Sequence, residues 1–325
     1  MRHITSYFFL MSSHIHILGL NPAWQRLFFV NRLQPGQVYR LDAARECASG
    51  KGINFARVFS LLGGQPSCWQ FAGGSTGKKL QYELDSISME HHTIPITGAT
   101  RICTTLSDSD GNSTELIEPG PILSPEECEA FFQGLSRAWP GMKRIALCGT
   151  APQGFDWPHL NALMIGNRKI YLDAWTGVQG WLEQGVELLK INAQELVQLL
   201  EESHVGKEKF SQTLVQKALT RWPIRVLVIT QGSQYAFACT QGKTWSLQPP
   251  HLDQFVNAIG AGDAFLAGWI HAENLNQPLP SRLAWGVAVS ATRCEAQWPW
   301  ELNVRKAETL AQELRPLVQE ISWNS

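Results

Sequence analysis

The sequence predicts an α/β protein with a mostly parallel central sheet, helices on both faces of that sheet, and a small β sheet that projects from it as a lid. Two observations carry this prediction. Short apolar runs alternate with longer amphipathic segments along most of the chain, and this alternation is typical of parallel sheets covered on both faces. Residues 25–42 and 100–118 break the rhythm, because each has the pattern of two strands around a Pro-Gly or an Asp-Gly turn. These two segments are expected to form the lid.

Each expected strand of the central sheet is a short apolar run bounded by turn residues. We expect strands at 14–20, 66–74, 144–149, 169–173, 186–192, 225–230 and 235–239. The segments between them predict helices at 53–63, 124–139, about 156–166, 192–202 and 209–221, with another from about Ala261. The helix at 124–139 has a clear start, because Ser124 precedes acidic residues in its first turn. Parallel sheets of this kind bind ligands at the carboxyl ends of their strands.

Composition limits the domain organisation and the class of partner. The chain has 325 residues, of which 44% are hydrophobic, and this suffices for one large α/β domain over residues 13–325. Charged residues make up 17% of the chain and the net charge is −1, so nothing supports binding to nucleic acid or to a membrane surface. No apolar run has the length of a membrane span.

The N-terminus and the cysteines both favour a cytoplasmic protein. The apolar patch within residues 1–12 is too short for the core of a signal peptide, and no cleavage site is evident. We therefore expect residues 1–12 to be a disordered extension. The seven cysteines are scattered singly, without a C-x-x-C pair, and an odd number without zinc spacing indicates reduced thiols.

The stretch NAIGAGDAFLAGW at 257–269 predicts a phosphate-binding turn. Gly260, Ala261 and Gly262 stand between an extended segment and an apolar helix. A helix N-terminus exposes unpaired N–H groups and the positive end of a dipole, so this turn can form an anion hole. Asp263 would then lie beside a bound polyphosphate, where a carboxylate can accept a proton from an attacking hydroxyl. The alternative is that Asp263 only caps the helix.

The stretch LLKINAQEL predicts a magnesium site. Asn192 and Glu195 lie three residues apart where a strand passes into a helix, which places both on one helical face. An amide and a carboxylate suit Mg²⁺, which keeps several waters and takes few protein ligands. The alternative is a capping box, in which the two side chains only close the start of the helix.

Two further turns predict contacts with a substrate. In SGKGINFAR, Gly50 and Gly52 flank Lys51, and Asn54 begins a helix. A lysine and an amide at a glycine-rich helix entrance suit a polar or anionic substrate. Thr150 follows a strand directly, where a ligand hydroxyl can be bound. The alternatives are an ordinary loop with a solvated lysine and a simple turn.

Other ligand-binding motifs are absent from the sequence. AGGSTGKK at 72–79 lacks the glycine spacing and the final Ser or Thr of a P-loop, and QGKT at 241–244 lacks the upstream glycine. No G-x-G-x-x-G follows the first strand, and neither H-E-x-x-H nor G-x-S-x-G occurs. A dinucleotide-binding fold is therefore disfavoured.

The order of these motifs resembles that of the ribokinase/PfkB family of carbohydrate kinases. Over about residues 14–300, the similar stretches are SGKGINFAR, FAGGSTGKKL, TRICTTL, CGTAPQGF, LLKINAQEL, VITQGSQYAF and NAIGAGDAFLAGW. Within the family, LNPAWQ, RLQPGQVYR, GKGINFAR and IEPGPILSPEE are most similar to the branch of 1-phosphofructokinases and tagatose-6-phosphate kinases.

The resemblance implies a ribokinase-like three-layer sandwich with a β lid, a homodimer through the lid, and transfer of a phosphoryl group from ATP, with Mg²⁺, to a hydroxyl of a sugar phosphate. It implies that Asp263 is the catalytic base, that Gly260, Ala261 and Gly262 form the anion hole, and that Asn192 and Glu195 bind the metal. The expected ATP-binding residues are Lys190, Asn192, Thr230, Gly232, Gly260 and Gly262. The resemblance places Lys51, Asn54 and Arg101 at the substrate, where Gln25, Gly50, Gly52, Thr150 and Asp263 are also expected. A lysine and an arginine that converge on one site suit a sugar phosphate better than a neutral sugar.

Two positions depart from the family's pattern: Ser49 replaces one of the two glycines usual before Lys51, and Gln25 leaves the identity of the sugar open. The family motif N-P-x-x-D ends in an aspartate that binds sugar hydroxyls, whereas Gln25 stands at that position in NPAWQ. An amide still bonds a hydroxyl but brings no charge. Two alternatives stay open: a kinase of an unphosphorylated sugar or a nucleoside, and a sugar-phosphate-binding sensor that has lost efficient catalysis. The intact turn at 260–263 counts against the sensor.

Overall fold

A computed structural model describes residues 13–42, 44–108, 113–163, 166–200 and 211–322. The expected extension at 1–12 and the Asp-Gly turn at 110–111 lie outside these ranges. Within them, no helix combines the length and the apolar character that crossing a membrane requires.

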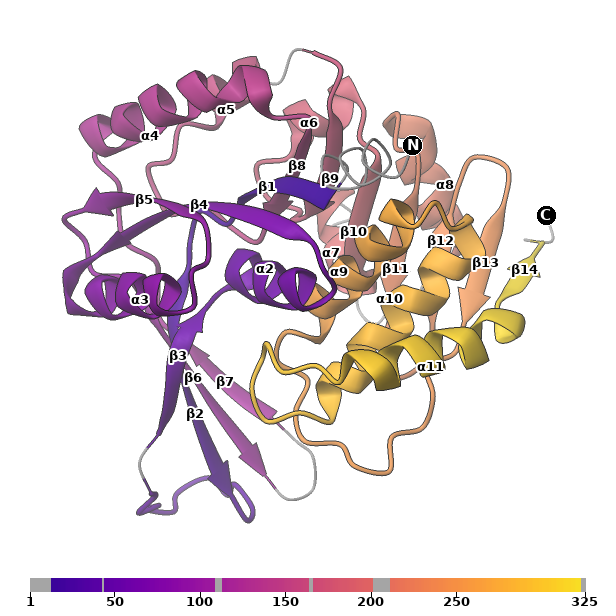
Figure 1. Ribbon diagram of the computed structural model, residues 1–325, viewed down its shortest axis with the longest axis horizontal. Helices are drawn as coiled ribbons and strands as arrows, with labels where there is room; N and C mark the ends of the chain where they lie inside the picture. Colours follow the sequence, from indigo (N-terminus) through magenta and orange to yellow (C-terminus); the bar gives the residue numbers. More distant parts are fainter. Residues whose placement is uncertain (1–12, 43, 109–112, 164–165, 201–210, 323–325) are drawn as a thin grey trace, which may run out of the picture.

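The described part of the chain forms a ten-stranded central sheet with the strand order β14-β13-β12-β11-β10-β9-β8-β1-β4-β5 (Figure 1). Its strands are β1 (His14–Leu18), β4 (Gln65–Gly73), β5 (His91–Ile96), β8 (Arg144–Cys148), β9 (Lys169–Asp173), β10 (Leu188–Asn192), β11 (Leu227–Thr230), β12 (Ala236–Cys239), β13 (Thr244–Leu247) and β14 (Gln319–Ile321). From β11 to β5 all neighbouring strands are parallel, and β12 to β14 continue the sheet antiparallel. The expected strands are all present, and β5, β13 and β14 are additional.

Helices form a layer on each face of this sheet (Figure 1). One layer consists of α2 (Lys51–Leu61), α9 (Ala261–Asn274), α10 (Leu279–Cys294) and α11 (Val304–Leu314). The other consists of α4 (Pro125–Ala138), α5 (Trp157–Leu163), α6 (Gln179–Gln184), α7 (Ala193–Leu199) and α8 (Gln212–Arg221). The mostly parallel α/β fold is therefore confirmed. Helices α6, α10, α11 and α3 (Gly74–Ser86) are additional to the expected ones. Most of α10 is buried, so its sequence lacks the two-faced pattern that identifies a surface helix.

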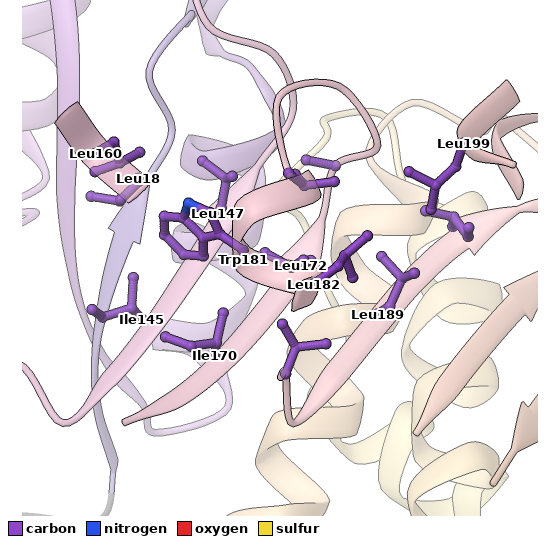
Figure 2. Close-up of a cluster of buried hydrophobic side chains, with 14 of the residues drawn as sticks. Leu18, Ile145, Leu147, Leu160, Ile170, Leu172, Trp181, Leu182, Leu189 and Leu199 are labelled. Atoms are coloured by element: carbon purple, nitrogen blue, oxygen red, sulfur yellow. The ribbon is translucent and has the colours of Figure 1, made fainter. Parts of the chain in front are cut away.

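The core explains why the strands of the central sheet are continuous apolar runs: both of their faces are buried. Neighbouring residues of a strand point to opposite faces: Ile17 packs in the core cluster under α2 and α9, and Leu18 packs in the cluster under α4 to α8. Figure 2 shows part of the second cluster, where leucines and isoleucines of β1, β8, β9 and β10 meet Trp181 of α6. Each fully buried side chain of this kind contributes about 1.5–3 kcal/mol of transfer free energy.

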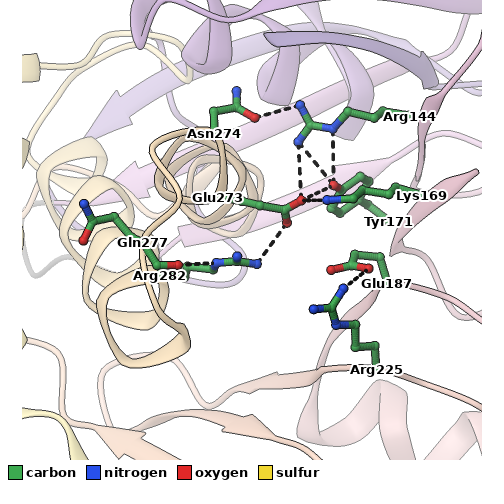
Figure 3. A network of polar contacts seen from close by, with 9 residues as sticks. All are labelled: Arg144, Lys169, Tyr171, Glu187, Arg225, Glu273, Asn274, Gln277 and Arg282. Carbon is green, nitrogen blue, oxygen red and sulfur yellow. Dashed lines mark hydrogen bonds and ion pairs between the residues drawn. The ribbon is translucent and has the colours of Figure 1, made fainter. Parts of the chain in front are cut away.

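A buried polar network anchors one end of α9 to the central sheet (Figure 3). Glu273, near the end of α9, accepts hydrogen bonds from Lys169 Nζ over 2.8 Å and from the Tyr171 hydroxyl over 2.7 Å. Its second oxygen pairs with Arg282 over 3.2 Å, and Arg144 lies 3.9 Å from the first. Burial of a carboxylate is tolerated here because several cations surround it. The network joins the C-terminal end of α9 to the beginnings of β8 and β9, so the N-terminal end of α9 lies at the carboxyl ends of the strands.

A second, smaller sheet has the strand order β3-β2-β6-β7 (Figure 1). Its strands are β2 (Ala23–Val30), β3 (Arg45–Ser49), β6 (Ile102–Asp108) and β7 (Ser113–Ile117). The pair β6 and β7 falls within the expected segment 100–118.

The prediction of two paired strands within residues 25–42 is wrong for the second strand. The partner of β2 is β3 at 45–49, and the described residues between 31 and 42 contain no strand. The Tyr39 hydroxyl donates to the carbonyl of Arg32 over 2.8 Å and accepts from the N–H of Gln34 over 2.7 Å. These bonds fold the segment around Pro35-Gly36 onto itself, so its backbone does not extend the ladder.

Candidate active site

The predicted site residues gather around one cavity of about 610 Å³ between the two sheets. Asp173, Asn192 and Thr230 are the last residues of the adjacent parallel strands β9, β10 and β11, so their side chains meet at one edge of the sheet. The start of α2, the turn before α9 and the smaller sheet complete the wall. The predicted residues on this wall are Gln25, Gly50, Lys51, Gly52, Asn54, Arg101, Thr150, Lys190, Asn192, Glu195, Thr230, Gly260, Gly262 and Asp263.

A second cavity of about 660 Å³ adjoins the first and shares Thr230, Ala258 and Gly262 with it. Gly232 and Ala261, the remaining predicted residues, line this cavity. Its wall includes apolar side chains of α9 and α10, among them Phe265 and Val287. A mostly apolar slot next to a charged cavity suits the base of a nucleotide whose phosphates point toward the charges.

The turn before α9 has the geometry of an anion hole. Gly260 precedes the helix with φ +73°, a left-handed conformation that favours glycine. The N–H of Ala261 donates to the carbonyl of Ala258 over 3.1 Å, so this N–H is used inside the turn. Within the described chain, the N–H groups of Gly262 and Asp263 have no protein acceptor. They remain available at the positive end of the helix dipole.

Asp263 does not cap α9, contrary to the alternative left open by the sequence. No side chain caps this helix, and Asp263 is buried. Its Oδ2 accepts a hydrogen bond from Nδ2 of Asn54 over 2.9 Å. Asn54 lies in the first turn of α2, so two helix entrances meet at this carboxylate.

Burial and the nearby charge of Asp173 raise the pKa of Asp263 to about 6, although Lys51, Lys190 and the Asn54 hydrogen bond act in the opposite direction. A carboxylate with this pKa is ionised at neutral pH and is a stronger base than an ordinary aspartate. These are the properties of a general base that works near pH 7.

Asp173 joins two lysines beneath the cavity. Its Oδ1 accepts from Lys51 Nζ over 2.9 Å, and its Oδ2 accepts from Lys190 Nζ over 2.7 Å. Only 1% of Asp173 is exposed. Burial opposes its ionisation, but Lys190 and Lys51 together hold the pKa of Asp173 below its usual range. For Lys51, burial disfavours the charge, yet Asp173 and Glu195 raise its pKa. Lys51 is therefore charged, and Asp173 holds both ammonium groups in place.

Asp173 is not among the predicted site residues, although the sequence carries one signal for it. This aspartate ends the apolar run KIYLD, and a carboxylate at the end of a buried parallel strand lies at the ligand-binding edge of the sheet. Glu115, Cys103 and Ile117, which the smaller sheet contributes to the cavity wall, were not predicted either.

Lys190 lies directly against the turn before α9. A methyl group placed on Gly262 would come within 2.9 Å of Lys190 Nζ. The missing side chain at Gly262 therefore gives the ammonium access to the turn. A positive charge and free N–H groups together stabilise a transferring phosphoryl group.

Asn192 and Glu195 do form the capping box that was the alternative for this pair. Asn192 Oδ1 accepts from the N–H of Glu195 over 2.8 Å, and Glu195 Oε2 accepts from the N–H of Asn192 over 2.8 Å. Glu195 Oε1 is left over and lies 3.6 Å from Lys51 Nζ on the cavity wall. A carboxylate oxygen held in this way can accept a hydrogen bond from a water bound to Mg²⁺, so the pair fits a magnesium ion as well as a cap.

Two of the predicted substrate residues, Gln25 and Arg101, lie at the end of the cavity formed by the smaller sheet. Gln25 is buried, and its Nε2 donates to Thr105 Oγ1 over 2.9 Å and to the carbonyl of Arg26 over 3.2 Å. Its Oε1 is thereby left for a ligand. Arg101 Nη2 donates to the carbonyl of Asn21 over 3.0 Å, and its buried Nε has no partner among the described residues. This guanidinium therefore retains hydrogen-bonding capacity beside the cavity.

Comparison with known proteins relates the chain to carbohydrate kinases. Residues 164–297 match the model of the pfkB family carbohydrate kinases. The chain is 28% identical to the 1-phosphofructokinase of Vibrio cholerae over 293 residues, which cover 86% of this chain and 89% of that relative. Its fold is similar to that of phosphofructokinase-2 from Escherichia coli in complex with substrates and products, with a TM-score of 0.79 and 21% identity, over 93% of this chain and 99% of that one.

A nucleoside kinase of Methanocaldococcus jannaschii, an archaeal member of the ribokinase family, is also similar in fold. Its TM-score is 0.67 and its identity 17%, over 93% of this chain and 98% of that one. The similarity to the PfkB family and the ribokinase-like fold that the sequence predicts are both confirmed.

Proposed function

We propose that this chain, whose residues 164–297 match the model of the pfkB family carbohydrate kinases, transfers the terminal phosphoryl group of ATP to a hydroxyl of a sugar phosphate. The observation that carries the proposal is the arrangement around Asp263. A buried carboxylate with a raised pKa lies next to two free N–H groups and within the field of two lysines. Phosphoryl transfer needs this combination of a base, an anion hole and positive charge.

The residues act together in one displacement. Asp263 accepts the proton of the attacking hydroxyl, and the N–H groups of Gly262 and Asp263 bind the equatorial oxygens of the transferring group. Lys190 lies against the same turn and offsets the charge that develops there. Asn192 and Glu195 would hold a magnesium ion through its waters, and the ion would neutralise charge on the phosphates.

The substrate's own phosphate is bound at the other end of the cavity. Arg101 is the cation on the part of the wall that adjoins the smaller sheet, and a guanidinium suits a phosphate through paired hydrogen bonds. Lys51, which the sequence also assigns to this phosphate, lies nearer the strand ends, where it pairs with Asp173 over 2.9 Å and lies 3.6 Å from Glu195. Anchoring this phosphate places the hydroxyl in line with ATP. A kinase of an unphosphorylated sugar or nucleoside would leave Arg101 without an anionic partner.

The direct test is ATP consumption by the purified protein with Mg²⁺ and a panel of fructose phosphates, tagatose phosphates and their parent sugars. Turnover with a phosphosugar and not with its parent sugar supports the proposal. Ligand-dependent thermal stabilisation without any ATP turnover would instead favour the sugar-phosphate-binding sensor.

The activity is expected to fall on the acid side of pH 6. Asp263 must be deprotonated to act as base, and its pKa is raised to about 6, mainly by burial. We expect kcat/KM to drop about tenfold per pH unit below this value and to level off above it, because kcat/KM reports the free enzyme. Initial rates at subsaturating sugar phosphate from pH 4.5 to 8.5 measure the profile. A flat profile down to pH 4.5 would contradict the raised pKa.

Replacement of Arg101 by alanine is expected to raise KM for the sugar phosphate about 10- to 100-fold with a smaller change in kcat, since one charged hydrogen bond contributes about 1.5–3 kcal/mol. Steady-state kinetics with varied sugar phosphate measure the effect. Arg26→Ala is the matched control, because Arg26 also lies on the smaller sheet but pairs with Glu46. An unchanged KM in Arg101→Ala would move the phosphate-binding site elsewhere.

We also infer a homodimer through the smaller sheet. Its edge strand β7 is exposed along its whole length, and Leu116 and Ile117 are more than half exposed. An exposed apolar edge strand is a surface for pairing with a second chain. Analytical ultracentrifugation that finds one chain per particle at micromolar concentration would argue against it.

A cytoplasmic location fits the thiols of this protein. All seven cysteines fall within the described residues and all are free. Thiols that stay unpaired suit a reducing compartment.

A further inference from the structure

A fully buried arginine stands behind the phosphate-binding turn. Arg293 is the second-last residue of α10, and 0% of it is exposed. Its Nη2 donates to Oδ1 of Asn257 over 2.7 Å and its Nη1 donates to the carbonyl of Ala296 over 2.9 Å, while its Nε has no partner. In the ranges that the structure describes, no carboxylate forms an ion pair with this guanidinium. A buried cation held only by neutral oxygens is a poor source of stability, so another role is needed to explain it.

The partner of Arg293 connects two segments of backbone. Asn257 is itself fully buried. Its Nδ2 donates to the carbonyls of Ala296 and Gln297, each over 3.2 Å, and its Oδ1 also accepts from the N–H of Ile259 over 3.1 Å. The side chains of Arg293 and Asn257 therefore join the loop after α10 to the turn that leads into α9.

The loop after α10 forms the back wall of the phosphate-binding turn. A methyl group on Gly260 would lie 3.1 Å from the carbonyl oxygen of Pro299, so loop and turn are in close contact. Burial lowers the pKa of Arg293 to about 10, and nearby carboxylates, including Glu301 and Asp263, oppose this decrease. The guanidinium is thus a cation at neutral pH, close enough to Asp263 for the two charges to interact.

We propose that Arg293 is a positioning residue for phosphoryl transfer: through Asn257 it holds the turn so that the N–H groups of Gly262 and Asp263 face the transferring group, and it places a positive charge behind them. The inference rests on the proposed kinase function, because it concerns the step that this turn performs. Misplacement of a catalytic group by about 1 Å can cost about 100-fold in rate.

The test compares Arg293→Met with a matched control at the opposite end of α9. Arg144 is also a buried arginine, and its Nη1 donates to Oδ1 of Asn274 over 2.7 Å. Both variants therefore lose a hydrogen bond from a buried guanidinium to an asparagine. Kinetics are measured with ATP and the sugar phosphate, at a temperature where circular dichroism shows that the wild type and both variants are folded.

Arg293→Met is expected to lower kcat about 10- to 100-fold while KM for the sugar phosphate changes less than about threefold. Arg144→Met is expected to keep kcat within about threefold of the wild type. Added guanidinium ion is expected to restore part of the kcat of Arg293→Ala and none in Arg144→Ala. Wild-type kcat in folded Arg293→Met, or equal losses in both methionine variants, would overturn the positioning role.

Arg293→Lys is the second variant if Arg293→Met does not fold. An ammonium keeps the charge but cannot reach both oxygens in the geometry of the guanidinium, so a loss of about 3- to 10-fold in kcat is expected. A lysine variant with wild-type kcat would also overturn the proposal. The wild type is assayed in parallel: if it turns over no substrate, the kinase function itself has failed, whereas a difference confined to the variants concerns Arg293 alone.

Discussion

Replacement of Asp263 by asparagine is expected to lower kcat about 10²- to 10⁴-fold, which is the usual contribution of a general base. Asparagine has nearly the same shape and can still accept the hydrogen bond from Asn54 that the carboxylate accepts over 2.9 Å. It cannot accept a proton from the attacking hydroxyl. KM is expected to change little, because the ground-state contacts of the substrate remain. Steady-state kinetics with saturating ATP, Mg²⁺ and sugar phosphate measure the effect.

The same variant is expected to be more stable than the wild type at neutral pH. Burial raises the pKa of Asp263 from 3.8 to about 6, so between these values the folded state binds a proton that the unfolded state does not. Stability therefore falls as the pH rises from about 4 to 6, by up to about 3 kcal/mol, since one pKa unit corresponds to about 1.4 kcal/mol. Asparagine removes this cost. Chemical unfolding at pH 7.5 should show the gain, and the gain should vanish near pH 4.

Asp85→Asn serves as the control for Asp263→Asn, because Asp85 is an exposed aspartate that pairs with His91. It should change neither kcat nor stability by a large factor. Near-wild-type turnover in Asp263→Asn would remove the proposed base. A loss of activity together with a large loss of stability would instead mean that the carboxylate holds the structure and that its pKa is not raised.

Replacement of Asp173 by asparagine is expected to destabilise the protein by about 3–5 kcal/mol, because it removes one partner from a buried ion-pair cluster. Asp173 accepts bonds from Lys51 and Lys190 over 2.9 and 2.7 Å. A neutral amide has only one oxygen for two ammonium groups, and its NH₂ group would face one of them. Urea unfolding at pH 7.5 measures the change in the free energy of unfolding.

At neutral pH, Asp173→Asn should lower the free energy of unfolding, whereas Asp263→Asn should raise it, and both changes should shrink in acid. The lysines hold the pKa of Asp173 below its usual range despite burial. Its stabilising contribution is therefore present above the ordinary aspartate pKa and is lost as the pH falls through the lower, folded value. Glu187→Gln is the matched control, because Glu187 pairs with the exposed Arg225 (Figure 3) and such pairs contribute about 0–1 kcal/mol. Equal losses in the two variants would show that the buried position of Asp173 has no special effect.

Much of the fold could be predicted because it depends on patterns within a few residues. The alternation of apolar and amphipathic segments reports which face of each element is buried, and the expected strands are all in the central sheet. The capping box of Ser124 with Glu127 needs only a spacing of three, and it forms as its sequence indicates. Strand β3 at 45–49 was missed, because the choice between it and residues 37–42 as partner of β2 depends on bonds that Tyr39 makes inside the connection.

For the site, the sequence by itself determined which residues stand at the ends of strands and helices. The glycines at 260 and 262, Lys51 and the pair of Asn192 with Glu195 occupy such ends, and Lys190 lies two residues before the end of β10. Parallel strands bring their carboxyl ends to one edge, so a linear list of these residues already predicts that they meet.

Only the tertiary structure decided how these residues affect one another. Asn54 and Asp263 are 209 positions apart in the chain and share a hydrogen bond. Asp173 binds two lysines that belong to different elements. Arg293 of α10 donates a hydrogen bond to Asn257, which lies in the segment before α9. The pKa of a carboxylate depends on burial and on every charge nearby, and neither quantity is local in sequence. The sequence therefore determined most of the chemical groups that the site contains, and packing decided which carboxylate has the raised pKa of the proposed base and which residues lie against the turn.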